Sequence, residues 1–201
     1  MSIRFRAYWD FICLFGRKGK GKSVFSKYII KSLNRYVIWD RHYEYLSGYF
    51  VYYPDRLREA FEQWKRIVYR PLTYSDEEFE EVCKFVLSQS NLTFIIEECD
   101  EHAHARGYST PLFQRIIRGG RHQGIGLILI SRRPAITHKD LRSQADYVIS
   151  FQMHEEDDIK YVGSWMGIEP QKIKELPDYH SILFNANTHD VTMQGPCSYY
   201  E

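Results

Sequence analysis

Eight residues near the start of the chain have the types and the spacing of a phosphate-binding loop. They fit the pattern G-x-x-x-x-G-K-[ST] at every fixed position, and they are Gly16, Arg17, Lys18, Gly19, Lys20, Gly21, Lys22 and Ser23. The glycines permit a tight turn in which successive backbone N–H groups point at phosphate oxygens. In this pattern Lys22 reaches the β- and γ-phosphates of a nucleotide, and the hydroxyl of Ser23 binds Mg²⁺. The loop therefore predicts a site for ATP and Mg²⁺.

The residues on either side of this loop have the patterns that the motif requires. Phe11 to Phe15 is a short apolar run typical of a strand, and apolar residues recur at helical spacing from Ser23 to Leu33. A strand, a glycine-rich turn and a helix in this order are typical of P-loop proteins. A basic glycine-rich turn without a ligand is the simpler alternative.

A second group of candidate residues follows the apolar run from Leu92 to Ile96, which ends in acids. Strands that are apolar throughout lie inside parallel sheets that are covered on both faces. In a P-loop enzyme, one carboxylate at this point holds the Mg²⁺ shell and another orients or deprotonates the attacking water. We assign the metal role to Glu97 and the role of catalytic base to Glu98, whereas a solvated loop explains Asp100 and Glu101.

A third group follows the apolar run from Ile125 to Ile130. Polar residues at the carboxyl end of a central strand face the nucleotide in an open α/β sheet. Ser131 and Arg132 are therefore both candidate sensors of the γ-phosphate. Two arginines precede the same run, Arg118 and Arg121, and a solvated helix end would also explain them.

The rest of the chain alternates between strand and helix patterns. Further strands are expected at 36–40, 48–53, 66–70, 147–152 and 179–185, and further helices at 55–64, 75–88, 110–118, 139–144, 154–167 and 170–176. Ser75 with Glu78 fits a capping box, Thr110 fits an N-cap, and Gly119 with Gly120 fits a helix end. Residues 187–201 carry no clear signal. We expect a single α/β domain over residues 1–201, with a core at 11–153 followed by helices and a strand at 154–201.

The composition restricts the classes of function. The formal net charge of +1 gives no global positive field, so any contact with DNA would be local. The four cysteines form no C-x-x-C pair, and no apolar run reaches membrane-spanning length. These features favour a cytoplasmic protein. His102 and His104 invite a zinc hypothesis that lacks a third ligand at the right spacing, and Asp40 fits either a turn cap or a nucleotide or interface role.

Four segments in this order resemble one family. They are the P-loop, the strand that ends in Glu97 and Glu98, the stretch RGGRHQGIGLILISRRP at 118–134 and the stretch LRSQADYVISFQM at 141–153. The series resembles the HerA and FtsK superfamily of hexameric DNA-pumping ATPases. It is most similar to the compact members that package genomes into membrane-containing and archaeal virus capsids. The chain departs from the usual pattern at Arg132, where glutamine is common, and at Glu97, where aspartate is more usual.

The resemblance implies a RecA-like P-loop NTPase with a mostly parallel central sheet, flanked by helices on both faces. It also implies a homo-oligomeric ring, expected as a hexamer, with ATP between subunits and double-stranded DNA in the central channel. In this family an arginine just ahead of the fourth core strand reaches the ATP of the neighbouring subunit. Arg118 and Arg121 match that position, and Arg121 is favoured.

The expected function is therefore Mg²⁺-dependent ATP hydrolysis coupled to DNA translocation, in a stand-alone viral genome-packaging motor. Capsid or internal-membrane proteins of a virion are expected partners, and the host cytoplasm or the virion is the expected location. Candidate DNA-facing residues are Arg41, His42, Lys139 and Arg142. Two alternatives stay open: a P-loop kinase or other small-molecule phosphotransferase, and a nucleotide-switch scaffold in virion assembly.

Overall fold

The computed structural model of the protein describes residues 5–197, and a sheet in the order β11-β10-β9-β1-β8-β5-β2-β4-β3 lies at its centre. The strands are β1 (Phe11–Phe15), β2 (Tyr36–Trp39), β3 (Tyr49–Val51), β4 (Arg66–Tyr69), β5 (Leu92–Ile96), β8 (Ile125–Ser131), β9 (Tyr147–Phe151), β10 (Ser181–Asn185) and β11 (Asp190–Gln194). The strands from β9 to β3 pair in parallel, and β10 and β11 add an antiparallel edge. The predicted mostly parallel sheet is confirmed.

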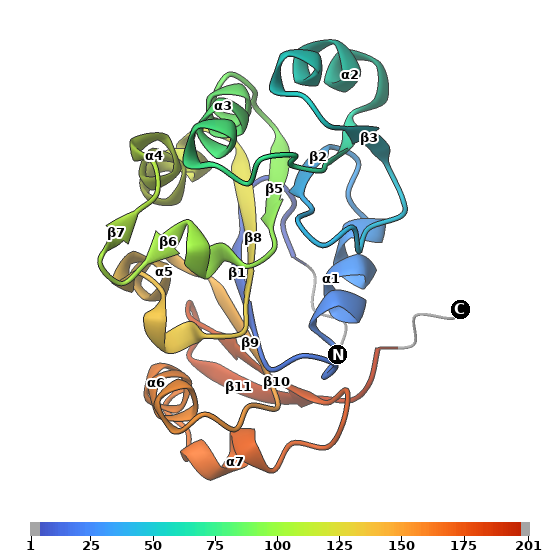
Figure 1. Cartoon of the computed structure of the whole chain (residues 1–201). Helices are drawn as coiled ribbons and strands as arrows, with labels where there is room; N and C mark the ends of the chain where they lie inside the picture. The colour runs from blue at the N-terminus through green and yellow to red at the C-terminus, as the bar shows by residue number, and fades with distance from the viewer. Residues whose placement is uncertain (1–4, 198–201) are drawn as a thin grey trace.

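Helices cover both faces of this sheet, but unevenly. They are α1 (Lys22–Lys31), α2 (Leu57–Trp64), α3 (Asp76–Leu87), α4 (Pro111–Gly119), α5 (Lys139–Gln144), α6 (Glu156–Met166) and α7 (Pro170–Lys174). In Figure 1, α1 lies on one side of the sheet, whereas α3 to α7 lie on the other. Alternate residues of β1 enter the two cores, with Cys13 on the α3 side and Leu14 on the α1 side. Burial on both faces explains why this strand is apolar throughout.

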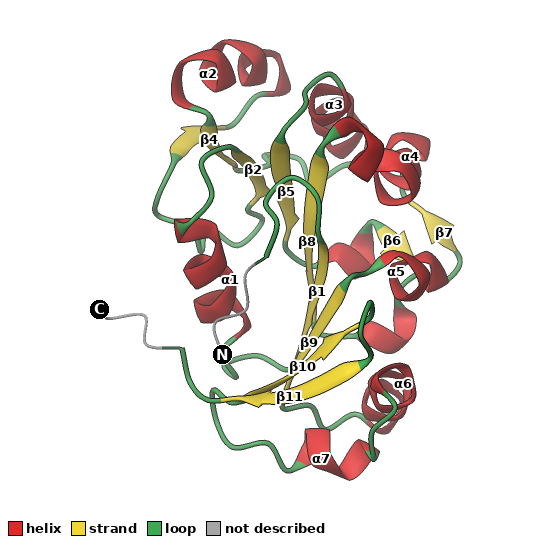
Figure 2. Ribbon diagram, turned by 180° about the vertical axis from the view of Figure 1, so that it is seen from behind, coloured by secondary structure: helices red, strands yellow, loops and turns green. Residues whose placement is uncertain are grey.

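The order of the central strands decides which residues can meet. β8 lies between β1 and β5, and Figure 2 shows these three strands side by side. Phe15 pairs with Ser131, and Ile96 pairs with Leu129. Because the three strands are parallel, their carboxyl ends lie at one edge of the sheet. The P-loop, the Glu97–Glu98 pair and Arg132 all begin at this edge.

The start of α3 confirms one half of the predicted capping box. The Ser75 hydroxyl accepts a hydrogen bond from the Glu78 backbone N–H at 3.1 Å. The Glu78 carboxylate, however, accepts from the backbone N–H of Thr73 at 2.8 Å and from the Tyr69 hydroxyl at 2.7 Å. The prediction that Glu78 would bond back to Ser75 is wrong, because donors of the preceding loop and of β4 occupy its carboxylate.

Replacing Ser75 with alanine is expected to lower the free energy of unfolding by about 1 kcal/mol, because the first turn of α3 loses its N-cap acceptor. Chemical denaturation followed by circular dichroism measures this change. The exposed Ser90, outside the helices, provides a matched serine-to-alanine control. Equal stability of the two variants would contradict the capping role.

The predicted end of α4 at Gly119 and Gly120 is confirmed: the α-helix ends at Gly119, and Gly120 is its C-cap. A 3-10 turn then continues over Gly120–Gln123. The chain turns at Gly124, where φ is 71° and a Cβ would lie 2.9 Å from Oδ1 of Asn91. The tail that carried no signal contains β11. A short hairpin of β6 (Ala103–His104) and β7 (Gly107–Tyr108) also lies outside the main sheet. The single domain over 1–201 stays a prediction, and its two ends lie outside the described residues.

Candidate nucleotide site

The P-loop joins β1 to α1 through a turn that excludes side chains. Gly16 and Gly21 have φ values of 151° and 114°. A Cβ on Gly16 would lie 2.7 Å from Cβ of Phe151, and one on Gly21 would lie 3.0 Å from the ring of the same residue. The two glycines therefore allow the loop to pass close to β9. A glycine-rich turn at the start of a helix is the kind of backbone that can present N–H groups to an anion.

Lys22, the first residue of α1, is 7% exposed. Its Nζ donates a hydrogen bond to the Arg17 carbonyl across the loop at 3.1 Å. Burial lowers the pKa of Lys22; the nearby Glu97 carboxylate opposes this effect, and the charge of Arg132 adds to it. Lys22 is thus held inside the loop. It lies close enough to Glu97, which follows β5, and to Arg132, which follows β8, for their charges to change its pKa.

Glu97, directly after β5, is 6% exposed. Its Oε1 accepts a hydrogen bond from the Tyr45 hydroxyl at 2.6 Å, and that hydroxyl lies 2.8 Å from the hydroxyl of Ser26 on α1. Burial raises the pKa of Glu97 to about 7. Tyr45 was not predicted as a site residue, and no local pattern could have indicated it, because the contact spans 52 residues.

Glu98 meets a guanidinium and an imidazole at the same edge. Its Oε1 lies 3.0 Å from Nη2 of Arg132 and 3.5 Å from Nε2 of His42. Ser131, the other candidate sensor, is 1% exposed, and its hydroxyl accepts from the Arg133 backbone N–H at 2.9 Å. Of the two candidates, Arg132 is the one whose side chain extends to the acidic pair.

Asp40 serves as a cap for the loop after β2. It is fully buried and accepts from the backbone N–H groups of Glu44 at 2.9 Å and Tyr45 at 3.3 Å, and Arg70 lies 3.4 Å away. These contacts hold the loop from which Tyr45 reaches Glu97. Of the two open roles for Asp40, the geometry supports the cap.

The candidate DNA-facing residues lie in different surroundings. Arg41 forms an ion pair with Glu101, so both Arg41 and His42 lie beside acids that follow β5. Arg142 donates to the Ser164 carbonyl at 3.1 Å and packs over the ring of Tyr161. Their contact with DNA stays a prediction.

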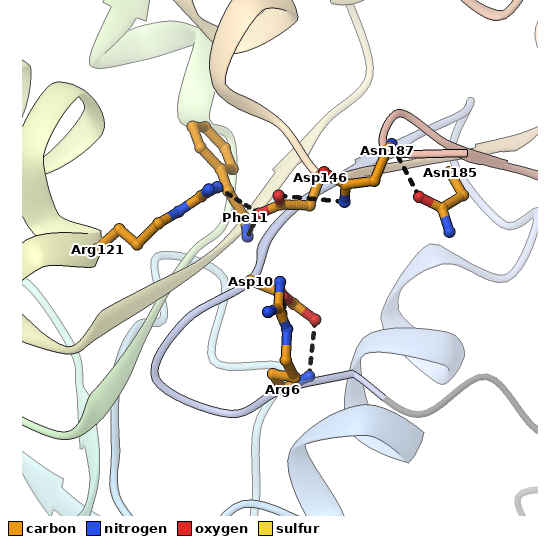
Figure 3. Close-up of polar contacts among 7 residues, drawn as sticks. All are labelled: Arg6, Asp10, Phe11, Arg121, Asp146, Asn185 and Asn187. Carbon is orange, nitrogen blue, oxygen red and sulfur yellow. Dashed lines mark hydrogen bonds and ion pairs between the residues drawn. The ribbon is translucent and has the colours of Figure 1, made fainter. Parts of the chain in front are cut away.

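Arg121 lies at the opposite edge of the sheet from the P-loop. Figure 3 shows its side chain directed at Asp146, with Nη2 2.6 Å from Oδ2. The same oxygen accepts from the backbone N–H of Phe11, the first residue of β1, at 2.8 Å. The P-loop follows the last residue of β1, whereas Arg121 lies near its first residue. The length of this strand, roughly 16 Å, therefore separates Arg121 from the P-loop. Arg118 pairs with Asp140 at 2.6 Å.

His102 lies in the hydrophobic core and not at the edge of the sheet where the P-loop begins. It is 4% exposed and stacks on Phe79 with a ring separation of 3.5 Å. Burial, followed by the charge of Arg41, lowers the pKa of His102 to about 3. His104 belongs to β6, in the hairpin.

Acid should therefore destabilise the protein through His102. The unfolded chain binds a proton here below about pH 6.5, whereas the folded chain does not until about pH 3. The free energy of unfolding should fall by up to about 1.4 kcal/mol per pH unit in this window as the pH is lowered. In His102→Phe, which cannot titrate, this contribution should be absent. Urea denaturation between pH 4 and 7 measures the difference, and a difference independent of pH would contradict the assignment.

An apolar pocket of about 320 Å³ adjoins the P-loop at the start of α1. Its lining residues are Gly21, Val24, Phe25, Phe151, Tyr179, Pro196 and Cys197. An ion pair between Lys20 of the P-loop and Asp178 holds the loop that carries Tyr179. The pocket has the size and the aromatic lining that suit a planar ring.

The helices of residues 5–197 include none that is both long and apolar enough to cross a bilayer.

Comparison with known proteins gives matches of sequence and of structure. No family model matches the chain. The DNA packaging ATPase P9 of Enterobacteria phage PRD1 is 23% identical over 94 residues, which cover 43% of this chain and 41% of P9. The matched part thus spans less than half of that relative.

Two solved structures match over nearly the whole chain. The genome packaging NTPase B204 from Sulfolobus turreted icosahedral virus 2, in complex with ATP-γS, has a TM-score of 0.80 and 24% identity, with coverage of 95% of this chain and 99% of B204. The DNA-packaging ATPase B204 from Sulfolobus turreted icosahedral virus has a TM-score of 0.76 and 24% identity, covering 94% of this chain and 98% of its own. The predicted fold and the predicted resemblance are confirmed: this chain has the fold of viral genome-packaging NTPases.

Proposed function

We propose that this protein is a Mg²⁺-dependent ATPase that moves double-stranded DNA during viral genome packaging. The observation that carries the proposal is the meeting of Lys22, the Glu97–Glu98 pair and Arg132 at one edge of the sheet, from three neighbouring strands. Support comes from the similar B204 structure, a genome packaging NTPase in complex with ATP-γS.

Each residue at this edge has a distinct task in the proposed reaction. The P-loop backbone and Lys22 bind the phosphates. The Ser23 hydroxyl and the Glu97 carboxylate are oxygen donors of the kind that Mg²⁺ prefers, so they fit a metal site that would neutralise charge on the phosphate oxygens. Glu98 accepts a proton from the attacking water. The pocket beside Tyr179 takes the adenine ring.

The opposite edge supplies the rest of the active site in a ring of subunits. Arg121 lies too far from its own P-loop to reach the same nucleotide, so it acts on the nucleotide of a neighbouring copy. A guanidinium at the transferring phosphoryl group stabilises the charge that develops there. We propose a homo-oligomeric ring, with the hexamer as the expected form, and DNA in its channel. Capsid or internal-membrane proteins of the virion are its further partners, in the host cytoplasm or on the virion.

The test is steady-state ATP hydrolysis over a range of protein concentrations, with and without duplex DNA, and with Lys22→Ala as the inactive control. The rate per subunit should rise steeply with concentration, because assembly completes the site, and should rise again with DNA. A constant rate that ignores DNA would contradict the motor. It would favour a small-molecule phosphotransferase, and a screen of acceptors would follow.

A further inference from the structure

The carboxylate of Glu98 is already engaged in this structure. Arg132 and His42 approach the same atom, Oε1, at 3.0 and 3.5 Å, and the Glu98 side chain is only 17% exposed. Its backbone is left-handed, with φ of 54° and ψ of 46°, a conformation that residues with a Cβ seldom adopt. A carboxylate oxygen that is held by a guanidinium is not free to accept a hydrogen bond from the attacking water in the same direction.

Arg132 lies where it can also meet the end of a nucleotide. It follows Ser131, which pairs with Phe15, the residue before the P-loop. After burial, the charge of Arg132 is one of the causes that lower the pKa of Lys22, so the two cations lie in range of each other. Lys22 is the residue that takes the terminal phosphates in a P-loop. One guanidinium therefore has two possible anionic partners, Glu98 and a γ-phosphate.

We propose that Arg132 is a nucleotide-dependent latch on Glu98. Without a γ-phosphate, Arg132 holds the carboxylate; when ATP binds, the more highly charged γ-phosphate takes the guanidinium and leaves Glu98 free for water. ADP lacks this group and leaves the contact intact. The inference rests on the proposed ATPase function and makes Arg132 a positioning residue for the base. It links the presence of ATP to the activity of Glu98.

The latch has a consequence for binding that does not require catalysis. If ATP must break the Arg132–Glu98 contact, part of the affinity for ATP is lost in breaking it. Removing the carboxylate should then strengthen the binding of ATP-γS and leave the binding of ADP unchanged. A contact between partly exposed groups is worth up to about 1 kcal/mol, so the gain should be about two- to five-fold.

Calorimetric dissociation constants for ADP and ATP-γS test this with wild type, Glu98→Ala, Arg132→Met and the double variant. Glu98→Ala should bind ATP-γS about two- to five-fold more tightly in the wild-type background and show no gain in the Arg132→Met background. If Glu98→Ala strengthened ATP-γS binding only because it removes a negative charge, the gain would appear in both the wild-type and the Arg132→Met backgrounds. Glu101→Ala is the matched control, because this acid of the same loop pairs with Arg41. Arg132→Lys should retain part of the coupling.

The outcomes separate the latch from the function. If wild type binds neither nucleotide, the proposed ATPase fails and the latch fails with it. If wild type binds both but Glu98→Ala changes ADP and ATP-γS alike, or gains equally without Arg132, the latch alone is overturned. A gain confined to ATP-γS that vanishes with Arg132→Met supports it.

Discussion

Glu98→Gln is expected to lower kcat for ATP hydrolysis by about 10² to 10⁴-fold, while the affinity for ATP changes by less than about tenfold. Glutamine keeps the size and the hydrogen-bonding oxygen of the side chain but cannot accept the proton of the attacking water. Single-turnover hydrolysis and equilibrium binding of ATP-γS measure the two quantities separately. Phosphate release should therefore slow by the same factor, while the protein still binds nucleotide.

Glu101→Gln is the matched control for this variant, because Glu101 follows the same strand and pairs with Arg41. Its kcat should stay near that of wild type. A normal kcat in Glu98→Gln would show that another group activates the water. A loss of binding equal to the loss of kcat would instead give Glu98 a structural role in the loop after β5.

Arg121→Ala is expected to reduce DNA-stimulated hydrolysis by about 10³ to 10⁵-fold, the range known for arginines supplied between subunits. Mixing this variant with Lys22→Ala should restore part of the activity. The first variant offers an intact P-loop, and the second offers an intact Arg121 from the adjacent position. Complete sites therefore form only where the two kinds of subunit meet. Hydrolysis at a fixed total concentration and varied mixing ratio measures the recovery.

Arg121 also makes a structural contact, its ion pair with Asp146. A variant of Asp146 distinguishes this contact from a role in catalysis. Asp146 also accepts from the backbone of Phe11 and lies 3.5 Å from the side-chain amide of Asn187, so it holds the starts of β1 and β9 and the turn before β11. Asp146→Asn removes the charge pair but leaves the arginine. If Asp146→Asn loses as much activity as Arg121→Ala and the mixture recovers none, Arg121 stabilises the edge of the sheet rather than a neighbour's nucleotide.

Much of the central fold could be predicted because it depends on local patterns. Strands such as β5 and β8 are buried on both faces, and burial on both faces requires the unbroken apolar runs that the sequence shows. β11 escaped prediction for the opposite reason. It is an edge strand whose side chains are mostly exposed, so it needs no apolar pattern, and only its pairing with β10 defines it.

The candidate site was predictable only in part. The P-loop and the acidic pair are consecutive residues, and their types indicate their chemistry directly. The contact of Tyr45 with Glu97 and that of Arg132 with Glu98 depend on which strands are neighbours, and no spacing along the chain encodes strand order. The end of α4 was predictable from the paired glycines, whereas the 3-10 turn that continues from it was not.

The distance between Arg121 and its own P-loop has a physiological consequence under the proposed assignment. Under that assignment, a subunit that holds its phosphate-binding loop at one end of β1 and its arginine at the other would not hydrolyse ATP alone, whatever the ATP concentration. Copies made early in infection would remain idle in the cell, without draining the host's energy supply, until they gather into a ring. Assembly of the ring would then start hydrolysis, and ATP would be consumed only where a capsid is ready to be filled.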